Sequence, residues 1–489
     1  MTPRERFWSL LNRYQSTLIG LVLAIGGGVV LGFITPMLSQ QNSYRLMMIV
    51  VAAGIGIGIF VTRQPKRIFV IAFILSIPLN LRFTPFVNDL AYHAGGAPPA
   101  VLIYIYDIPF LGLVALWIRD IMLLRKPIRF SAIDSVAIIF LLWTALSLFT
   151  AGEYFGYTVA EVIRLLKTYL AGIIISNFIT SKSRLLDVLW ALIIAILIQT
   201  MFAISQYFFN ADLTALGGFT VGTVNRVSGT VGWPNTFGAW IAMGMAIIIG
   251  YWIANVFPRW NFLFFPVIAL SALPLAISFS RGAWLALAVA LSIIYALSAL
   301  ARLLRPVDFV RLFVIGIIAL LAGLYFSGAI EERAQQDTVS VRYELSNIAS
   351  RMIQDEPLIG IGVNTFTLKM PNYDNTGVVS YFREPVHNIY FLIGAENGVV
   401  GLALFLLMNG VAFFVAIRTI LISKDRLLVA TSIAFAGGLV VLLISNVADV
   451  HLKFDPILTL YWLILGMIGV SARMTVDWKL TKDSEPDAT

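Results

Sequence analysis

The chain has 489 residues, of which 59% are hydrophobic and 12% are charged, and its formal net charge is +8. A soluble protein of this length could not bury so much apolar side chain, so the composition indicates a polytopic membrane protein. The chain contains no cysteine, which excludes disulfides and thiolate metal sites and leaves the redox compartment undetermined.

Apolar runs of about twenty residues recur along the chain without the alternation of barrel strands, so they predict an all-α, polytopic helical fold. About fourteen transmembrane helices are expected, at residues 16–36, 44–62, 67–81, 101–118, 133–150, 158–179, 185–207, 235–256, 261–279, 283–301, 310–328, 388–417, 427–447 and 457–472. They leave residues 1–489 as a single membrane domain with a cytoplasmic tail at 473–489.

Basic residues predict the orientation of these spans. With the N-terminus inside, most of the 34 lysines and arginines fall in inner loops, which places both termini in the cytoplasm. The positive net charge is then a topology signal, and nucleic acid is not expected as a partner. The first apolar run is a full span without an obvious small-residue cleavage site, so no cleavable signal peptide is expected.

Three outer segments are longer than the other connections, at 82–100, 208–234 and 329–386. The last is predicted to form a helix from about Val339 to Gln354, followed by a Pro-Gly turn through Pro357 and Gly362. A structured extracytoplasmic loop of this size usually has a function.

All three histidines, His93, His387 and His451, lie outside the membrane on this topology. Their spacing fits no local metal motif and no clustered carboxylates support one, so no metal site is expected. His387 stands where the long outer loop meets an apolar helix. Two interpretations of it remain open: a general base at the membrane surface, or a helix-start residue that bonds to the preceding loop.

Two arginines lie on the outer side, where arginine is under-represented. Arg226 precedes the span at 235–256, and Arg281 lies in the turn between the spans at 261–279 and 283–301. The planar arginine fork can bind two phosphate oxygens and keeps its charge, although snorkelling to lipid headgroups would explain either residue alone. Together with Arg342 in the long loop, they predict a diphosphate site.

Acidic residues could orient the histidine. Glu396 follows His387 by nine residues, so in a regular helix the two would point to opposite faces, and a direct pair is not expected. Asp449 and Asp455 in the last outer loop are better candidates, and the choice between them stays open. Glu396 is expected to pair with backbone groups or an arginine, because an acidic residue near the membrane needs a partner.

Glu161, Arg164 and Lys167 follow one another at i,i+3 spacing on one helix, which predicts a structural ion network. A contribution of Arg164 to the anionic site is the second possibility, because this residue also lies towards the outer end of its span.

Three motifs occur in order: Ser280-Arg281-Gly282 before an apolar helix, Asp355-x-Pro357-Leu358-Ile359-Gly360-Ile361-Gly362 in the long loop, and His387-Asn388 followed by Glu396-x-Gly398-x-x-Gly401. Together they resemble the O-antigen ligase and O-antigen polymerase family of bacterial membrane glycan transferases. The resemblance covers about residues 220–405, and the first half of the chain matches only in hydropathy. The fourteen expected spans depart from the twelve usual for the ligases.

The resemblance implies transfer of a glycan from undecaprenyl diphosphate to an acceptor hydroxyl at the outer face of the cytoplasmic (inner) membrane, without metal or cofactor. In that family a histidine matching His387 acts near the acceptor, and arginines matching Arg226 and Arg281 hold the diphosphate. A ligase would join the finished glycan to a lipid or protein acceptor, whereas a polymerase would join glycan to glycan, and the motifs do not separate the two.

A transporter or lipid flippase for polysaccharide precursors is the alternative from a different class. Such a protein would be expected to place ionisable residues and broken helices at the membrane midplane. The notable charged residues here cluster at the outer edge, which favours surface chemistry. The sequence does not determine the sugar, the acceptor or the oligomeric state.

Overall fold

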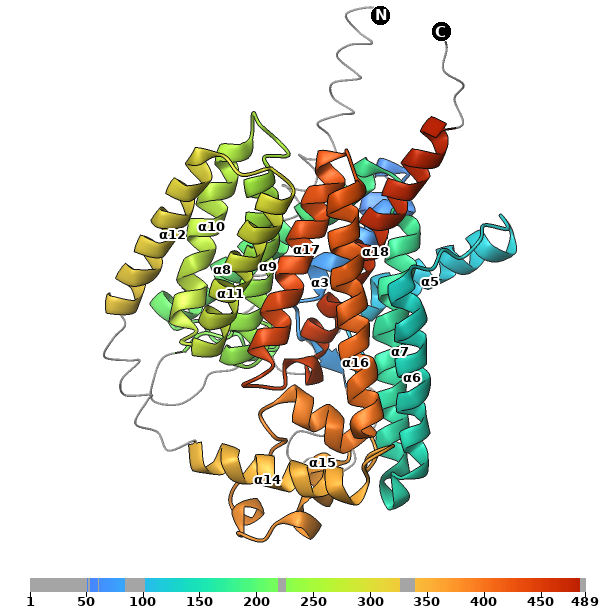
Figure 1. Ribbon diagram of the computed structural model, residues 1–489, viewed down its shortest axis with the longest axis vertical. Coiled ribbons are helices and arrows are strands. Elements are labelled where there is room, and N and C mark those ends of the chain that lie inside the picture. The colour runs from blue at the N-terminus through green and yellow to red at the C-terminus, as the bar shows by residue number, and fades with distance from the viewer. Residues whose placement is uncertain are drawn as a thin grey trace, which may run out of the picture.

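The computed structural model describes residues 51–83 apart from 52 and 60, 102–218, 226–325 and 339–483. Figure 1 shows its helices, which are α3 (Pro65–Ser76), α5 (Asp107–Met122), α6 (Ala132–Leu146), α7 (Phe155–Phe178), α8 (Lys182–Phe209), α9 (Pro234–Ala254), α10 (Phe264–Ile277), α11 (Arg281–Leu300), α12 (Pro306–Tyr325), α14 (Val339–Asp355), α15 (Phe366–Lys369), α16 (Ile389–Ile422), α17 (Arg426–Ser445) and α18 (Asp455–Asp483). Within the described residues, strand pairing is limited to two-residue strands, β1 (Arg82–Phe83) and β2 (Ile103–Tyr104), which run antiparallel. The predicted all-α membrane fold is confirmed.

Seven helices among the described residues are long and apolar enough to cross a membrane, judged by length and composition. The expected span at 67–81 is shorter in the structure, because α3 ends at Ser76, two residues before the helix-breaking Pro78. The expected span at 101–118 begins instead as strand β2, and α5 starts only at Asp107. The span at 16–36 and most of 44–62 lie outside the described residues, so the count of fourteen is not confirmed.

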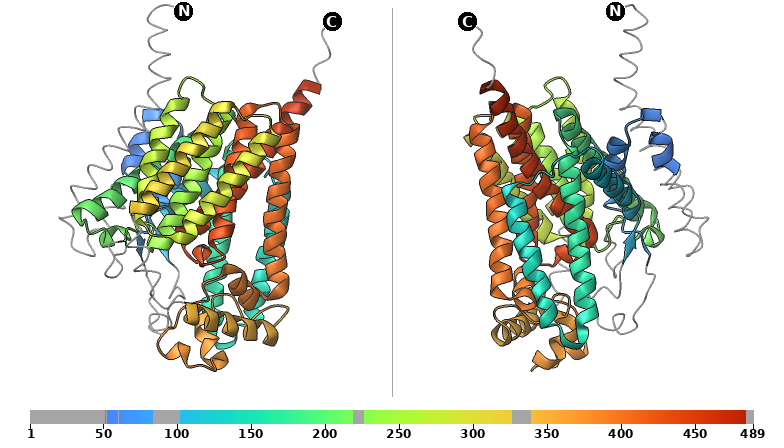
Figure 2. Two further views of the ribbon diagram at one scale, coloured as in Figure 1. Left: turned by 60° about the vertical axis from the view of Figure 1, so that its left-hand side comes forward. Right: turned by 90° about the vertical axis from the view of Figure 1, so that its right-hand side faces the viewer.

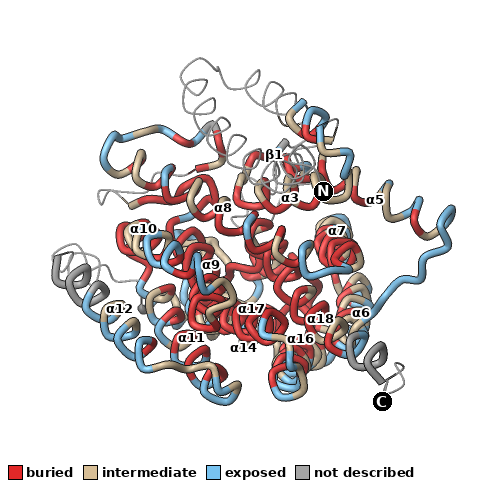
Figure 3. The backbone as a smooth tube through the Cα atoms, turned by 90° about the horizontal axis from the view of Figure 1, so that it is seen from above, coloured by how far each residue is buried: buried red, intermediate tan, exposed pale blue. Residues whose placement is uncertain are grey.

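Helices α9 and α17 form the centre of the bundle and are buried along most of their length (Figure 3). A helix enclosed on all sides must be apolar on all faces, as α9 is. Small residues allow the two helices to approach closely, since a Cβ atom added at Gly250 would lie 2.6 Å from the Cα of Ala434. Such small-residue contacts are typical of membrane helix packing. Around this pair, α11 and α18 pack against α17, while α7 packs against α18 and α6 against α16.

The two ends of the bundle differ, as Figures 1 and 2 show. The turn between α16 and α17 lies at the end where α18 finishes, and α14 and α15 lie at the opposite end. Helices α9, α11, α16 and α18 begin, and α17 ends, at the end that faces α14 and α15. Residues just outside these five helix ends are therefore brought together beneath the bundle.

Helix α14 is amphipathic and lies across this end of the bundle rather than within it (Figure 2). Its apolar residues Leu345, Ile348, Ala349 and Met352 are fully buried and follow the i, i+3, i+4, i+7 spacing of a single helix face. The predicted helix from Val339 to Gln354 is confirmed to within one residue.

Helix α16 is interrupted at Gly398, whose φ of 70° and ψ of 178° belong to a region that essentially only glycine occupies. The Pro357–Gly362 turn of the long loop packs into this break. Backbone hydrogen bonds across it are Ile361 N–H to the Ala395 carbonyl (2.9 Å), Gly362 N–H to the Glu396 carbonyl (3.2 Å) and Val399 N–H to the Pro357 carbonyl (2.8 Å). They satisfy polar groups that an interrupted helix would leave without partners. The second and third sequence motifs are thus one interlocked structural unit.

Candidate functional site

His387 lies just before α16 and faces Asp449, which follows α17. The His387 Nδ1 atom is 3.8 Å from Asp449 Oδ1, and the two side chains are 20% and 14% exposed. This distance exceeds that of a direct hydrogen bond, and the two groups carry opposite charges only when the ring is protonated. The start of α16 is fixed beside the end of α17, because Ile389 N–H donates to the Asn446 carbonyl (3.0 Å). The Asn388 side chain caps α16 by accepting from the first backbone N–H groups of the helix.

The other ring nitrogen of His387 faces a second carboxylate. Its Nε2 atom is 3.7 Å from Glu384 Oε2, and the Glu384 side chain is 47% exposed. The Phe382 ring lies beside the imidazole, with 6.1 Å between the ring centroids. The histidine is therefore held between an enclosed carboxylate at Nδ1 and an open carboxylate at Nε2.

Asp449 is suited to remain ionised. Burial acts to raise its pKa, but the neighbouring His451 and His387 rings and the Val450 N–H together hold the pKa of Asp449 well below its ordinary value. His451 is itself buried, and burial lowers the pKa of its ring. At neutral pH this arrangement favours a negative Asp449 beside an uncharged His451.

A series of hydrogen bonds connects Asp449 to Arg226. The Arg226 guanidinium donates from Nε to the Ser278 carbonyl (2.9 Å) and from Nη2 to Asn235 Oδ1 (2.8 Å). Asn235 in turn donates from Nδ2 to Asp449 Oδ2 (3.0 Å). The predicted residues Arg226, Asp449 and His387 thus occupy one continuous polar site.

The other two predicted arginines lie around this series. Arg281 is the exposed first residue of α11 and follows the same turn whose Ser278 carbonyl binds Arg226. Its guanidinium forms no hydrogen bond or ion pair with the part of the chain that the structure describes. Arg342 extends from α14 and donates from Nη1 to the Ala448 carbonyl (3.4 Å), next to Asp449.

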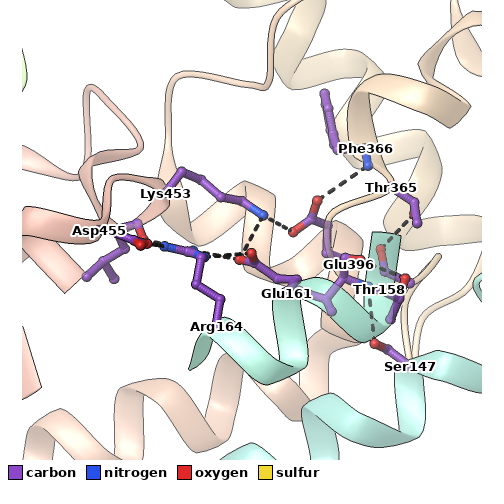
Figure 4. Close-up of polar contacts among 12 residues, drawn as sticks. Ser147, Thr158, Glu161, Arg164, Thr365, Phe366, Glu396, Lys453 and Asp455 are labelled. Atoms are coloured by element: carbon purple, nitrogen blue, oxygen red, sulfur yellow. Dashed lines mark hydrogen bonds and ion pairs between the residues drawn. The ribbon is translucent and has the colours of Figure 1, made fainter. Parts of the chain in front are cut away.

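A second polar cluster is a buried ion network that joins α7, α16 and the segment between α17 and α18 (Figure 4). Its acidic members Glu161, Glu396 and Asp455 are all at most 3% exposed. Its contacts are Arg164 Nη2 to Glu161 (2.7 Å), Arg164 Nη1 to Asp455 (2.6 Å), Lys453 Nζ to Glu396 (2.9 Å) and Lys453 Nζ to Glu161 (3.5 Å). Tyr106 also donates from its hydroxyl to Asp455 (2.9 Å).

The network shows the partners of several residues that the sequence singled out, among them the structural Glu161–Arg164 pair that the i,i+3 spacing predicts. Asp455 binds Arg164, so Asp449 is the aspartate that faces His387. Glu396 pairs with Lys453 and accepts from a backbone N–H, that of Phe366 (3.3 Å), rather than meeting an arginine. Both ends of the Arg164 guanidinium are bound to carboxylates, which removes it from the anion-binding set.

Two other expectations can be placed. Lys167 leaves the Glu161–Arg164 pair and binds Asp107 (3.2 Å) instead. His451 lies against the hydroxyl of Thr236, with its Nδ1 3.4 Å from Oγ1, and His93 lies outside the described residues. Across the residues that the structure describes, no three or more His, Asp or Glu side chains are grouped to hold a metal ion.

The sequence reasoning missed Asn235, Lys453 and Glu384. Lys453 carries the same signal that singled out Arg226, a basic residue on the side where such residues are scarce. Asn235 follows a Trp-Pro pair at the start of a helix, where asparagine is usually interpreted as a cap. Glu384 is three residues before His387, and no local pattern distinguishes it from a solvated loop residue.

Comparison with known families now decides the assignment. A family model described as O-antigen ligase matches residues 266–406, from α10 through the first part of α16. This segment belongs to the O-antigen ligase family. It includes all three sequence motifs and His387, whereas Arg226 and Asp449 lie on either side of it. No curated protein sequence matches the chain.

The O-antigen ligase match and the apolar helices among the described residues support an integral membrane protein with a role in O-antigen biosynthesis. The match supports, in general terms, glycan transfer by a glycosyltransferase-like enzyme that acts on a lipid-linked glycan.

Proposed function

We propose that the protein transfers a glycan from undecaprenyl diphosphate to an acceptor hydroxyl at the outer face of the cytoplasmic membrane. One observation carries the proposal: Arg226, Asn235, Asp449 and His387 form a continuous series at the end of the bundle next to α14. The series joins a group suited to bind phosphate with a group suited to accept a proton.

Arg226, Arg281 and Arg342 bind the diphosphate of the donor. Arginine matches phosphate oxygens with two parallel N–H groups and stays charged at all relevant pH values. As the bond between the anomeric carbon and the phosphate oxygen breaks, negative charge develops on the leaving diphosphate. Fixed guanidinium groups at that position lower the barrier because they stabilise the transition state more than the ground state.

His387 is the base for the acceptor. Asp449, held ionised, favours the tautomer with a proton on Nδ1, which leaves Nε2 to accept the proton of the attacking hydroxyl. The acceptor oxygen bonds to the anomeric carbon while undecaprenyl diphosphate leaves on the opposite side, so the anomeric centre is inverted. Every proton and charge in this step is carried by a side chain, by the acceptor or by the diphosphate, so the reaction proceeds without added metal or cofactor.

The distribution of basic residues and the difference between the two ends of the bundle support a membrane topology for the protein. Both termini lie in the cytoplasm of a multi-pass inner-membrane protein, and the site opens on the extracytoplasmic side. The described part of the long loop, residues 339–386, covers the site and shapes the acceptor groove, with α14 against the helix ends and the Pro357–Gly362 turn packed into the break in α16.

The test uses purified protein in vesicles with EDTA, an undecaprenyl-diphosphate-linked glycan and candidate acceptors. Appearance of the glycan on an acceptor, with release of undecaprenyl diphosphate, supports the proposal. A single addition indicates a ligase, and a ladder of products indicates a polymerase. Movement of the intact lipid-linked glycan across the bilayer without transfer would instead support a flippase.

A further inference from the structure

We propose that Asn235 is a positioning residue that separates the diphosphate-binding Arg226 from Asp449, and so keeps Arg226 directed at the diphosphate and Asp449 directed at His387. This inference rests on the proposed function and adds a residue to it. Asn235 is the second residue of α9. Its side-chain oxygen accepts from Arg226 (2.8 Å), and its side-chain nitrogen donates to Asp449 (3.0 Å).

The chemistry of the two neighbours fixes the orientation of this amide. A guanidinium offers only donors and an ionised carboxylate offers only acceptors, so the group between them must accept on one side and donate on the other. A side-chain amide does both at fixed geometry. Aspartate at this position would place a second carboxylate against Asp449, and alanine would leave both neighbours without this partner.

The amide also separates two opposite charges that would otherwise pair. Arg226 and Asp449 both bind the same small amide, so only its length lies between them. Without it, the two would be drawn into a direct ion pair, because attraction between opposite charges rises steeply at short range in a partly buried site. That pair would draw the arginine away from the diphosphate and the carboxylate away from His387, so one substitution would disturb both halves of the site.

The backbone around Asn235 is well suited to hold this position. Pro234 starts α9 and fixes the first helical φ, and α9 continues into the buried centre of the bundle. The next residue, Thr236, contacts His451 through its hydroxyl (3.4 Å). Consecutive side chains of one helical turn therefore hold two ionisable residues of the last outer loop. A rigid helix gives a more accurate platform than a loop.

The test compares variants of the full-length protein in the vesicle assay, with thermal unfolding measured in parallel. We expect Asn235→Ala to lower kcat and to raise KM for the lipid-linked donor, each by about tenfold or more, while the unfolding midpoint stays near that of wild type. By contrast, Asp449→Asn should act mainly on kcat. Arg226→Lys keeps the charge that stabilises the leaving diphosphate but loses the two-oxygen contact, so it should act mainly on donor KM.

Two further variants separate positioning from structural support. Asn261→Ala removes a buried asparagine that donates to the Trp252 carbonyl (3.2 Å) near the opposite end of α9, so it should lower the unfolding midpoint and leave kcat and KM unchanged. The exchange Asn235→Asp with Asp449→Asn keeps one amide and one carboxylate in contact but moves the charge away from His387. We expect this double variant to have the unfolding midpoint of wild type but a lower kcat than wild type.

Wild-type kinetics in Asn235→Ala, or full activity in the exchanged pair, would overturn the inference while the proposed function stands. A loss of activity that follows the loss of thermal stability equally in Asn235→Ala and Asn261→Ala would also overturn it, because it would show a structural role. Absence of transfer by wild type with every acceptor would overturn the proposed function and this inference together.

Discussion

Substitution of Gly398 by alanine tests how the long loop is joined to the catalytic helix. The φ and ψ of Gly398 are 70° and 178°, and holding alanine there costs on the order of 1–3 kcal/mol. The added Cβ atom would also lie 2.0 Å from the carbonyl oxygen of Leu358, so the loop turn or the helix must move. That movement strains the three backbone hydrogen bonds across the break, each with a net value of about 1 kcal/mol.

The sum of these terms predicts that Gly398→Ala lowers the free energy of unfolding by about 4–6 kcal/mol. Transfer should fall as well, since the first part of α16 follows directly from His387. The measurement is thermal unfolding of the purified protein, together with the initial rate of glycan transfer. Gly410→Ala on the same helix is the matched control, because a Cβ atom at Gly410 meets nothing within 4 Å. Alanine there should be neutral, or stabilising by roughly 0.5–1 kcal/mol. Equal unfolding midpoints for the two variants would refute the interlocked loop.

The remaining predictions concern individual charges. Lysine in place of Arg226 cannot form both hydrogen bonds of the guanidinium and cannot bind two phosphate oxygens at once. Steady-state kinetics of Arg226→Lys should therefore show a KM for the donor about tenfold higher than that of wild type. An unchanged donor KM would contradict this role of Arg226. The depressed pKa of Asp449 means that its stabilising contribution is present above the ordinary aspartate pKa of about 4 and is lost as the pH falls further. Wild type should therefore lose stability relative to Asp449→Asn between about pH 5 and pH 2, and a constant difference in unfolding midpoint across that range would argue against it. Lys453→Met leaves the buried Glu396 without its ion-pair partner and leaves Glu161 paired with Arg164 alone. It should destabilise the protein by about 3–5 kcal/mol in unfolding measurements, whereas Lys424→Met, at an exposed position, should have no effect; equal effects would contradict the buried network.

Hydropathy predicted the bundle because a lipid environment demands continuous apolar helices with internally satisfied backbones. Helices α8, α9 and α17 accordingly begin and end within a few residues of their predicted spans. The same signal is averaged over about twenty residues, so it does not register the interruption at Gly398, although the polar Glu396 and Asn397 directly precede it. It also assigned full spans where a proline ends α3 and where β2 precedes α5.

The candidate site could be predicted only in part. Arginine is under-represented on the outer side of a membrane protein, which made Arg226 recognisable. His387 was recognisable from its place where the long loop meets an apolar helix, and Asp449 as an acidic residue of the last outer loop; the structure brings the three together. The partner of each charge depends on contacts between segments far apart in sequence, such as that of Lys453 with Glu161. No local spacing encodes such a pair. Asn235 carries no charge and was therefore not recognised.

The most direct test of the central claim is glycan transfer by His387→Ala in vesicles that contain EDTA and the lipid-diphosphate-linked donor. Thermal unfolding and retained donor binding serve as controls that the variant is folded. We expect wild type to transfer the glycan and the folded His387→Ala protein to lose at least a hundredfold in rate, within the range typical of a positioned general base. Transfer by His387→Ala at the wild-type rate would contradict the assignment of His387 as the base.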